Sequence, residues 1–164
     1  MQRYFVDNKD NNYMVLDKDD MHHVKNVMRM KPYDLIECVY KERVYVCKVI
    51  SPDINKFEIV NELDENNEMS VEVTIAISLV KEKKMDLILQ KLTELGVSRI
   101  IPVEMERSVV RLDSKKFKKK KERWEKICKE ASEQSKRNKI PIIDDIKKIK
   151  ELSLFATLHT AFKA

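Results

Sequence analysis

Glycine is almost absent from this sequence. Gly96 is the only glycine among 164 residues, whereas glycine makes up about 7% of an average protein. Loops that wrap around a nucleotide or a similar cofactor usually need positive φ or a close backbone approach, and glycine permits both without steric cost. The composition therefore argues against a glycine-rich cofactor loop in these residues, although a coding bias towards lysine and asparagine would also thin out glycine.

Long apolar runs and paired cysteine motifs are missing as well. No stretch of about 18 apolar residues is present, which excludes a hydrophobic helix that spans a membrane. The N-terminus becomes polar within about seven residues, so we do not expect a signal peptide. Cys38, Cys47 and Cys128 are odd in number and lack Cys-x-x-Cys spacing. This pattern predicts reduced thiols in a cytoplasmic protein and no zinc cluster.

Charged residues, in contrast, are abundant and unevenly distributed. They make up 37% of the chain, above the usual ~25%. Residues 1–70 contain 10 basic and 14 acidic residues, a net of −4, and residues 71–164 contain 23 basic and 14 acidic residues, a net of +9. The acidic run at 61–68 predicts an exposed turn or linker. We therefore expect one domain at 1–70 and a second at 71–164.

The first domain is predicted to be a small β-barrel with one helix. Short runs of β-branched and aromatic residues predict strands at 3–6, 13–16, 34–40, 43–50 and 57–60. Lys41 and Glu42 separate two of these strands and indicate a hairpin turn. Apolar residues at helical spacing predict a helix at 19–30.

The second domain is predicted to be a parallel α/β domain. A strand at 71–80, a helix that ends at Gly96 and a strand at 97–103 form a βαβ unit, whose strands almost always pair in parallel. The first of these strands becomes continuously apolar, which is typical of a strand covered on both faces. A long helix with Trp124 in its core face is then expected, followed by a short strand and a short helix; these elements span 114–138, 140–143 and 144–152.

Four sequence blocks resemble a known family. They are Gln2-Arg-Tyr-Phe-Val6, His22-His-Val-Lys-Asn-Val-Met-Arg29, Lys84-Met-Asp-Leu-Ile-Leu-Gln-Lys-Leu-Thr-Glu-Leu-Gly96 with Glu106-Arg-Ser-Val-Val-Arg111, and Arg123-Trp-Glu-Lys-Ile-Cys-Lys-Glu-Ala-Ser-Glu-Gln-Ser-Lys-Arg137. The sequence resembles the RsmE family, enzymes that methylate N3 of a uridine in bacterial 16S ribosomal RNA. It departs from the family at Pro32-Tyr33, where a Gly-Asp pair is usual, and at Lys136, which replaces a glycine.

The resemblance implies a fold, a reaction and partners. The fold is α/β overall, with a PUA-like RNA-binding β-barrel followed by a SPOUT-type parallel α/β domain. In the family a deep trefoil knot of that domain holds S-adenosyl-L-methionine, and the enzyme acts as a homodimer on ribosomal RNA of the small subunit. The sequence ends at Ala164, before the family's Gly-Pro-Glu-Gly-Gly knot segment. The resemblance therefore implies an incomplete copy of the enzyme, with a non-catalytic RNA-binding module and a protein-interaction adaptor as alternatives.

Three arginines are candidates for the catalytic site. Arg107 and Arg111 follow the strand predicted at 97–103, at the carboxyl edge of a parallel sheet, where open α/β folds bind ligands. Arginine makes bidentate contacts with phosphate, so both are expected to contact RNA or the reacting base, with a surface ion pair as the alternative. Arg137, at the end of the long helix, is expected either to line the catalytic cleft or to balance the helix C-terminus.

A run of lysines is expected to bind RNA. Eight cations crowd into about three turns of the long helix, and four of them are consecutive: Lys118, Lys119, Lys120 and Lys121. Such a face neutralises phosphates, whereas the alternative is a solvated helix surface without function.

The first domain contributes Arg3, His22 and Arg29 as further expected RNA contacts. His22 and Arg29 are seven residues apart and lie on nearly the same side of a helix. A partly buried histidine is the alternative for this position. Neighbouring helical residues point about 100° apart, so His22 and His23 cannot bind one metal ion together, and we predict no metal site.

Overall fold

The structure is a computed structural model that describes residues 1–105 and 114–152. The chain separates into two compact units. The first comprises Met1–Glu68 and Ser132–Lys139, and the second comprises Met69–Ala131 and Ile140–Ala164. The first change of unit, between residues 68 and 69, lies close to the division expected at residue 70. Residues 132–139 belong to the first unit although they follow most of the second unit in the sequence. The sequence did not predict this.

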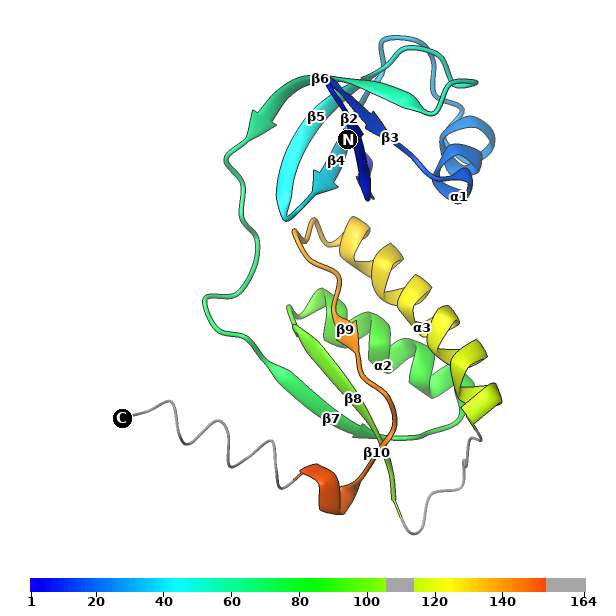
Figure 1. Cartoon of the computed structure of the whole chain (residues 1–164), viewed down its shortest axis with the longest axis vertical. Coiled ribbons are helices and arrows are strands. Elements are labelled where there is room, and N and C mark those ends of the chain that lie inside the picture. Colours follow the sequence, from blue (N-terminus) through cyan, green and yellow to red (C-terminus); the bar gives the residue numbers. More distant parts are fainter. Residues whose placement is uncertain (106–113, 153–164) are drawn as a thin grey trace. The chain divides into compact units, whose positions relative to one another are not determined.

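A curled six-stranded sheet forms the first unit (Figure 1). Its spatial order is β1-β4-β5-β6-β3-β2, and β1 and β4 are the parallel pair in an otherwise antiparallel sheet. The strands are β1 (Arg3–Phe5), β2 (Asn8–Asp10), β3 (Tyr13–Val15), β4 (Leu35–Tyr40), β5 (Arg43–Val49) and β6 (Lys56–Leu63). The five predicted strands are confirmed, whereas β2 is polar and fully exposed and therefore carries no apolar alternation that would reveal it.

The β4–β5 hairpin is the centre of this unit. Residues 36–39 of β4 and 44–47 of β5 are buried without interruption, which shows that both faces of the hairpin are covered. One face joins Tyr4, Met14 and Phe57 in the main apolar cluster. The predicted hairpin turn is confirmed: Lys41 and Glu42 connect the strands with φ values of 49° and 67°, as a two-residue hairpin loop requires.

The helix of the first unit is short and changes its winding. α1 (Lys18–His22) begins at Asp17, whose side chain accepts a hydrogen bond from the backbone N–H of Asp20 at 2.8 Å. It continues as the π-helical turn η1 (His23–Val27). Val24 is buried in the main cluster of the unit, whereas most residues of η1 are exposed. The predicted helix at 19–30 is therefore confirmed in type and shorter at its C-terminal end.

The second unit contains a parallel sheet covered by two helices. Its elements are β7 (Thr74–Ser78), α2 (Glu82–Glu94), β8 (Arg99–Glu104), α3 (Ser114–Gln134), β9 (Ile142–Ile143) and β10 (Lys147–Lys148). β8 pairs in parallel with β7, β9 and β10, which confirms the predicted βαβ unit. α2 and α3 lie side by side against the sheet (Figure 1), and residues of both helices, Trp124 among them, form one apolar cluster with β8.

The last strand of this sheet corrects a prediction. Residues 144–152 were expected to form a helix, but Lys147 and Lys148 pair with Val103 and Glu104 of β8, and helical residues begin only at Ile149. An isolated helix of about nine residues is marginal in water. The open edge of β8 supplies backbone partners that such a helix lacks, so strand pairing prevails.

The burial pattern of β7 corrects a second prediction. This strand was expected to be buried on both faces, yet Thr74 and Ala76 are exposed, while Ile75 and Ile77 face the apolar cluster. β8, in contrast, is buried at four consecutive residues. Within the described residues, β7 therefore has the pattern of a strand covered on one face.

Gly96 ends α2 as predicted. Its φ is +91°, the left-handed conformation that commonly follows the last helical residue and that glycine adopts most readily. A Cβ atom at this position would lie 2.9 Å from Cγ and Sδ of Met69. The backbone conformation therefore favours glycine here, and any side chain at this position would require the flexible side chain of Met69 to move.

Candidate functional site

Arg3, the predicted RNA contact in β1, lies inside the first unit with 0% of its surface exposed. Its Nε is 2.8 Å from Oε2 of Glu37, and its Nη2 is 2.8 Å from Oε1 of Glu65. Its Nη1 donates to the backbone carbonyls of Lys136 and Arg137, at 2.6 and 3.2 Å. Every nitrogen of the guanidinium group therefore has an acceptor within the unit. An RNA contact of Arg3 stays a prediction, and this geometry favours a structural role.

Glu37 joins two cations in the same cluster. Besides Arg3, it binds Nζ of Lys136 at 2.9 Å. Burial alone would raise the pKa of the Glu37 carboxyl, but the hydrogen bonds from Lys136 and Arg3 outweigh it, so the pKa is lowered. Lys136 has a φ of +59° and stands where the resembled family has glycine. The lysine thus adopts a conformation that glycine favours, while its side chain completes the cluster.

Arg137, the third catalytic candidate, is also buried, at 2% exposure. Its Nη2 is 2.5 Å from Oε2 of Glu68, and Oε1 of the same carboxylate accepts the backbone N–H groups of Asn138 and Lys139 at 2.8 and 3.0 Å. Burial alone would raise the pKa of Glu68, but the hydrogen bond and the charge of Arg137 lower it. The position of Arg137 in an active site stays a prediction; in this structure its guanidinium group binds Glu68.

Asn138 completes the attachment of Ser132–Lys139, which we call the inserted segment. Its side-chain amide donates to the carbonyls of Glu42 and Glu65 at 2.9 and 2.8 Å, and its Oδ1 accepts the N–H of Asn67 at 3.2 Å. The acidic run at 61–68 was expected to be an exposed turn or linker. Most of the run is exposed as expected, but Glu65 and Glu68 are half-buried partners of arginines, because the inserted segment brings its charges next to them.

The run of lysines on α3 divides into two classes. Nζ of Lys121 is 3.0 Å from Oδ1 of Asp145, and Nζ of Lys120 is 3.6 Å from Oε1 of Glu82. These two lysines are half-buried and have acidic partners within their own unit. Their charges are therefore partly neutralised before any RNA binds.

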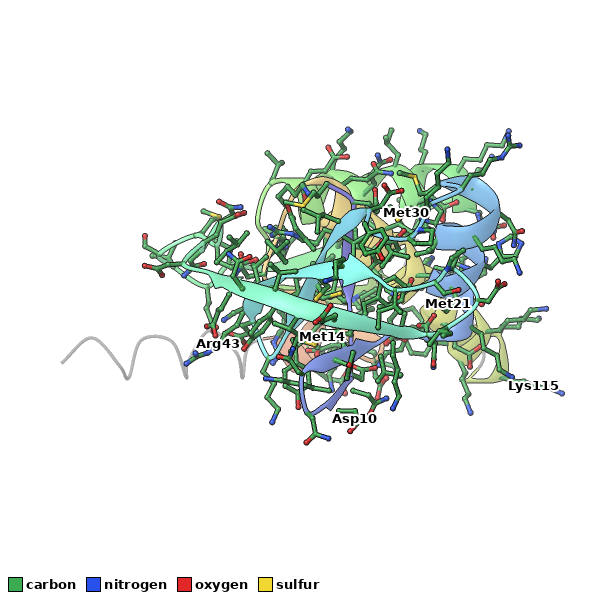
Figure 2. All side chains as sticks on the ribbon, turned by 90° about the horizontal axis from the view of Figure 1, so that it is seen from above. Asp10, Met14, Met21, Met30, Arg43 and Lys115 are labelled. Carbon is green, nitrogen blue, oxygen red and sulfur yellow. The ribbon has the colours of Figure 1, made fainter. Side chains whose placement is uncertain are left out.

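Lys118 and Lys119 are different. Both are exposed, and neither has an ion pair within the part of the chain that the structure describes. Lys115, one turn earlier, is exposed too, and its side chain extends away from the ribbon (Figure 2). These three lysines form the accessible basic stripe of α3, and we use that name for them below. RNA binding by the lysine run stays a prediction. We now apply it to this stripe, because Lys120 and Lys121 already have acidic partners.

The histidines of the first unit also differ from each other. His22 is exposed, whereas His23 is half-buried and its Nδ1 lies 2.9 Å from the hydroxyl oxygen of Tyr4. Burial raises the pKa of the Tyr4 hydroxyl, and the nearby carboxylates of Asp20 and Glu133 raise it further. Tyr4 is therefore a neutral hydrogen-bond partner of His23. No group of three metal-binding side chains occurs in residues 1–105 and 114–152.

The other two catalytic candidates, Arg107 and Arg111, lie outside the described residues. Arg29 is described and exposed, with a φ of +50°. Among the described residues, the structure brings Arg3 and Arg137 together with their glutamates. The catalytic role of Arg107 and Arg111 stays a prediction.

Two family models match this chain in consecutive segments. Residues 16–60 match the RNA methyltransferase PUA domain, and residues 67–160 match the RNA methyltransferase domain. The chain belongs to the RNA methyltransferase domain family. The resemblance to the RsmE family is confirmed, as is the predicted fold class, a PUA-like unit followed by a SPOUT-type parallel α/β unit. Within residues 1–105 and 114–152 of this chain, every helix is too short or too polar to cross a membrane.

Two relatives of the same name match most of this chain. The chain is 39% identical over 160 residues to ribosomal RNA small subunit methyltransferase E of Bacillus subtilis (strain 168), covering 93% of this chain and 62% of that protein. It is 36% identical over 144 residues to the protein of the same name from Mesomycoplasma hyopneumoniae (strain 232), covering 88% of this chain and 62% of that protein. The chain thus spans less than two thirds of the length of both relatives.

A solved structure shows the same architecture. A ribosomal RNA small subunit methyltransferase E from Neisseria gonorrhoeae, determined bound to S-adenosyl methionine, is 31% identical to this chain. The two superpose with a TM-score of 0.82 over 92% of this chain and 64% of that one.

Sequence reasoning missed the acidic half of the buried cluster. Glu37, Glu65 and Glu68 were not singled out, because each is far in the sequence from the cation it binds. One signal was available: Arg3 stands in a strand beside Tyr4 and Phe5, and a charged residue in a buried strand needs a buried partner. The identity of that partner depends on the tertiary fold.

Proposed function

We propose that this chain belongs to an S-adenosyl-L-methionine-dependent enzyme that methylates N3 of a uridine in ribosomal RNA of the small subunit. The observation that carries the proposal is the order of the two family matches, a PUA domain followed by an RNA methyltransferase domain, along a chain 39% identical to a relative of that name. By the same resemblance we propose action as a homodimer. Action in the cytoplasm agrees with the three free, buried cysteines.

The reaction needs charge stabilisation more than covalent chemistry. The imide proton of uracil must leave N3, so negative charge develops on the base in the transition state. Fixed cations close to the base would stabilise that charge, and positioning of the RNA would supply much of the remaining acceleration. Arg107 and Arg111 are our candidates for this role. We propose that Arg137 instead supports the site by holding the inserted segment in place.

S-adenosyl-L-methionine supplies the methyl group in the proposed reaction, and the described residues contain no glycine-lined loop that would hold it. A loop that holds such a cofactor needs close backbone approach. Gly96, the single glycine, closes α2, and Met69 fills the space next to its α-carbon. We therefore assign no cofactor contact to residues 1–105 or 114–152. A non-catalytic RNA-binding module is the second candidate function, because the exposed cations of α3 can meet RNA phosphates whether or not the cofactor binds.

The RNA contacts are proposed to come from both units. On α3, the accessible basic stripe supplies cations without acidic partners among the described residues. In the first unit, His22 and Arg29 are exposed and remain our candidates. Each phosphate neutralised releases counterions, so the affinity for RNA is expected to fall steeply with salt.

The two candidate functions differ in their response to the cofactor. The chain would be incubated with small-subunit ribosomal RNA and methyl-labelled S-adenosyl-L-methionine, and 3-methyluridine would be measured in the digested RNA. Calorimetry with the cofactor alone would run in parallel. Cofactor binding with 3-methyluridine supports the enzyme. RNA binding without either supports the non-catalytic module, and the absence of RNA binding excludes both.

A further inference from the structure

Tyr33 combines two unusual features in the first unit. It is 79% exposed, although aromatic side chains usually bury most of their surface. Its backbone has a φ of +75°, a region that is a genuine outlier for bulky residues because the Cβ atom crowds the following carbonyl oxygen there. Neither feature contributes to the apolar core, and backbone strain retained at an exposed position is a pointer to function.

The turn that carries Tyr33 is held firmly. Asp34 N–H donates to the carbonyl of Lys31 at 3.1 Å, and Lys31 N–H donates to Oδ2 of Asp34 at 2.7 Å. Tyr33 N–H donates to the carbonyl of Val49 at 2.8 Å, and Val49 N–H donates to the carbonyl of Asp34 at 2.9 Å. With Pro32 at the second position, the turn resembles type II, in which the third residue has positive φ. The ring is therefore presented on a rigid backbone.

Exposed apolar and basic residues lie close to Tyr33 along the chain and across its backbone hydrogen bonds. Leu35 and Ile50 are exposed large apolar residues close to Tyr33 along the strands that hold the turn. Arg29 and Lys31 are exposed, and neither has an ion pair among the described residues. An exposed aromatic ring next to such cations is the combination that binds single-stranded nucleic acid, because bases stack on the ring while cations meet the phosphates.

We propose that Tyr33 is a stacking platform for an unpaired base of the RNA substrate, with Arg29 and Lys31 contacting the flanking phosphates. This proposal rests on the proposed function, since it names the part of the RNA that the first unit binds. Residues 1–70 carry a net charge of −4, and charges beyond a Debye length of about 8 Å are largely screened at physiological salt. The contact is therefore local. Because a base must be unpaired to stack on the ring, we expect the contact to select single-stranded over duplex RNA.

The test measures the affinity of the whole chain for single-stranded oligouridine and for a duplex RNA of the same length. Stacking on an aromatic side chain changes affinity by roughly 5- to 150-fold per base. Tyr33→Ala is expected to weaken oligouridine binding within that range and to leave duplex binding unchanged. Tyr33→Phe and Tyr33→Trp retain a ring and are expected to keep the affinity.

The dependence on salt separates stacking from charge. Tyr33→Ala removes no charge, so the slope of log affinity against log salt should not change. Arg29→Gln and Lys31→Gln should each reduce that slope by about 0.7, the value for one phosphate on a single strand. Tyr33→Gly controls for folding. Glycine relieves the positive φ, so this variant should be at least as stable as the parent chain. It should nevertheless bind oligouridine as weakly as Tyr33→Ala, because it also lacks the ring.

Failure of the inference is distinguishable from failure of the proposed function. If the parent chain binds no small-subunit ribosomal RNA, both are wrong. If it binds that RNA and Tyr33→Ala binds oligouridine as tightly as the parent, the stacking platform alone is wrong. A loss of affinity in Tyr33→Phe equal to that in Tyr33→Ala would also overturn it, because stacking does not need the hydroxyl group.

Discussion

Arg137 and Glu68 are 69 positions apart in the sequence, and their side chains form an ion pair with 2.5 Å between Nη2 and Oε2. Both side chains are largely buried, with 3% and 10% of their surface exposed. The pair joins the inserted segment, which begins in the last turn of α3, to the end of the first stretch of the same unit. In the same unit, the Arg3 cluster also pairs cations with carboxylates. The buried charges of both groups are therefore neutralised by partners within the unit.

Removing one partner of the Arg137–Glu68 pair should destabilise the protein strongly. Arg137→Met leaves the Glu68 carboxylate buried without its cation, and breaking a buried pair in this way costs about 3–5 kcal/mol. Urea unfolding at pH 7 measures the change in free energy. The double variant Arg137→Met with Glu68→Leu should recover part of the stability, because no buried charge is then left unpaired.

Arg43 provides the matched control. It pairs with Glu62 at 2.9 Å, but both side chains are exposed, and exposed pairs contribute about 0–1 kcal/mol. Arg43→Gln should therefore change the free energy of unfolding by no more than that. Equal destabilisation in Arg43→Gln and Arg137→Met would contradict the structural role of the buried pair.

Stability should decrease in acid because of Glu37 and Glu68. The pKa of each carboxyl is lower in the folded state than the ordinary value of about 4.3. The unfolded chain therefore takes up protons first as the pH falls. The stabilisation by these groups is fully present above about pH 4.3 and is lost as the pH falls through their lowered folded pKa values.

The pH dependence can be measured as the urea midpoint between pH 7 and pH 3. Glu37→Gln should lower the midpoint at pH 7 and flatten the decline below about pH 4.3, because one of the titrating groups is gone. Glu94→Gln is the control, since Glu94 is an exposed partner of Lys91 and its removal should change the midpoint much less. A decline as steep in Glu37→Gln as in the parent chain would assign the acid sensitivity to other groups.

The two classes of lysine on α3 should differ in RNA binding. Changing Lys118 and Lys119 to glutamine removes two accessible cations, which should reduce the slope of log affinity against log salt by about 0.7–0.9 for each phosphate that is no longer neutralised. Changing Lys120 and Lys121 to glutamine should reduce it less, because Glu82 and Asp145 already neutralise them in part. Equal slopes in both double variants and the parent would assign the whole run to solvent.

Glycine substitutions should have opposite effects at two positions. Glu42 has a φ of +67°, so Glu42→Gly relieves a conformation that costs about 1–2 kcal/mol for an L-residue. The greater freedom of glycine in the unfolded chain offsets about 0.4–1 kcal/mol of that, and a small net gain in stability is expected. Gly96→Ala introduces strain at φ +91° and a contact of 2.9 Å with Met69, so it should destabilise. Thermal unfolding of both variants gives the sign, and a stabilising Gly96→Ala would contradict both the backbone strain and the contact with Met69.

Local patterns were sufficient for most elements of the fold. The βαβ unit of β7, α2 and β8 followed from helical spacing, a strand on either side and Gly96 at the helix end, all of which are properties of adjacent residues. The hairpin at Lys41 and Glu42 was equally local. The residues at 144–152 could not be assigned in the same way, because β10 forms only where β8 offers an open edge.

The candidate site was less accessible to sequence reasoning. Arg137 was expected either to line the catalytic cleft or to balance the helix C-terminus, and its ion pair with Glu68 could not be foreseen from neighbouring residues. Lys118 and Lys120 look identical in the sequence, yet only the second has an acidic partner among the described residues. Tyr33 had been noted only as a departure from the family, and its exposure became visible with the fold.

The sequence by itself determined the family, most of the strands and helices and the positions of the basic residues, because these depend on the identity and spacing of neighbours along the chain. The tertiary structure alone decided which charges are paired and which remain accessible. Arg3 is buried because Glu37 and Glu65 converge on it from distant positions, and the energy of a charge depends on the groups and the solvent around it in space.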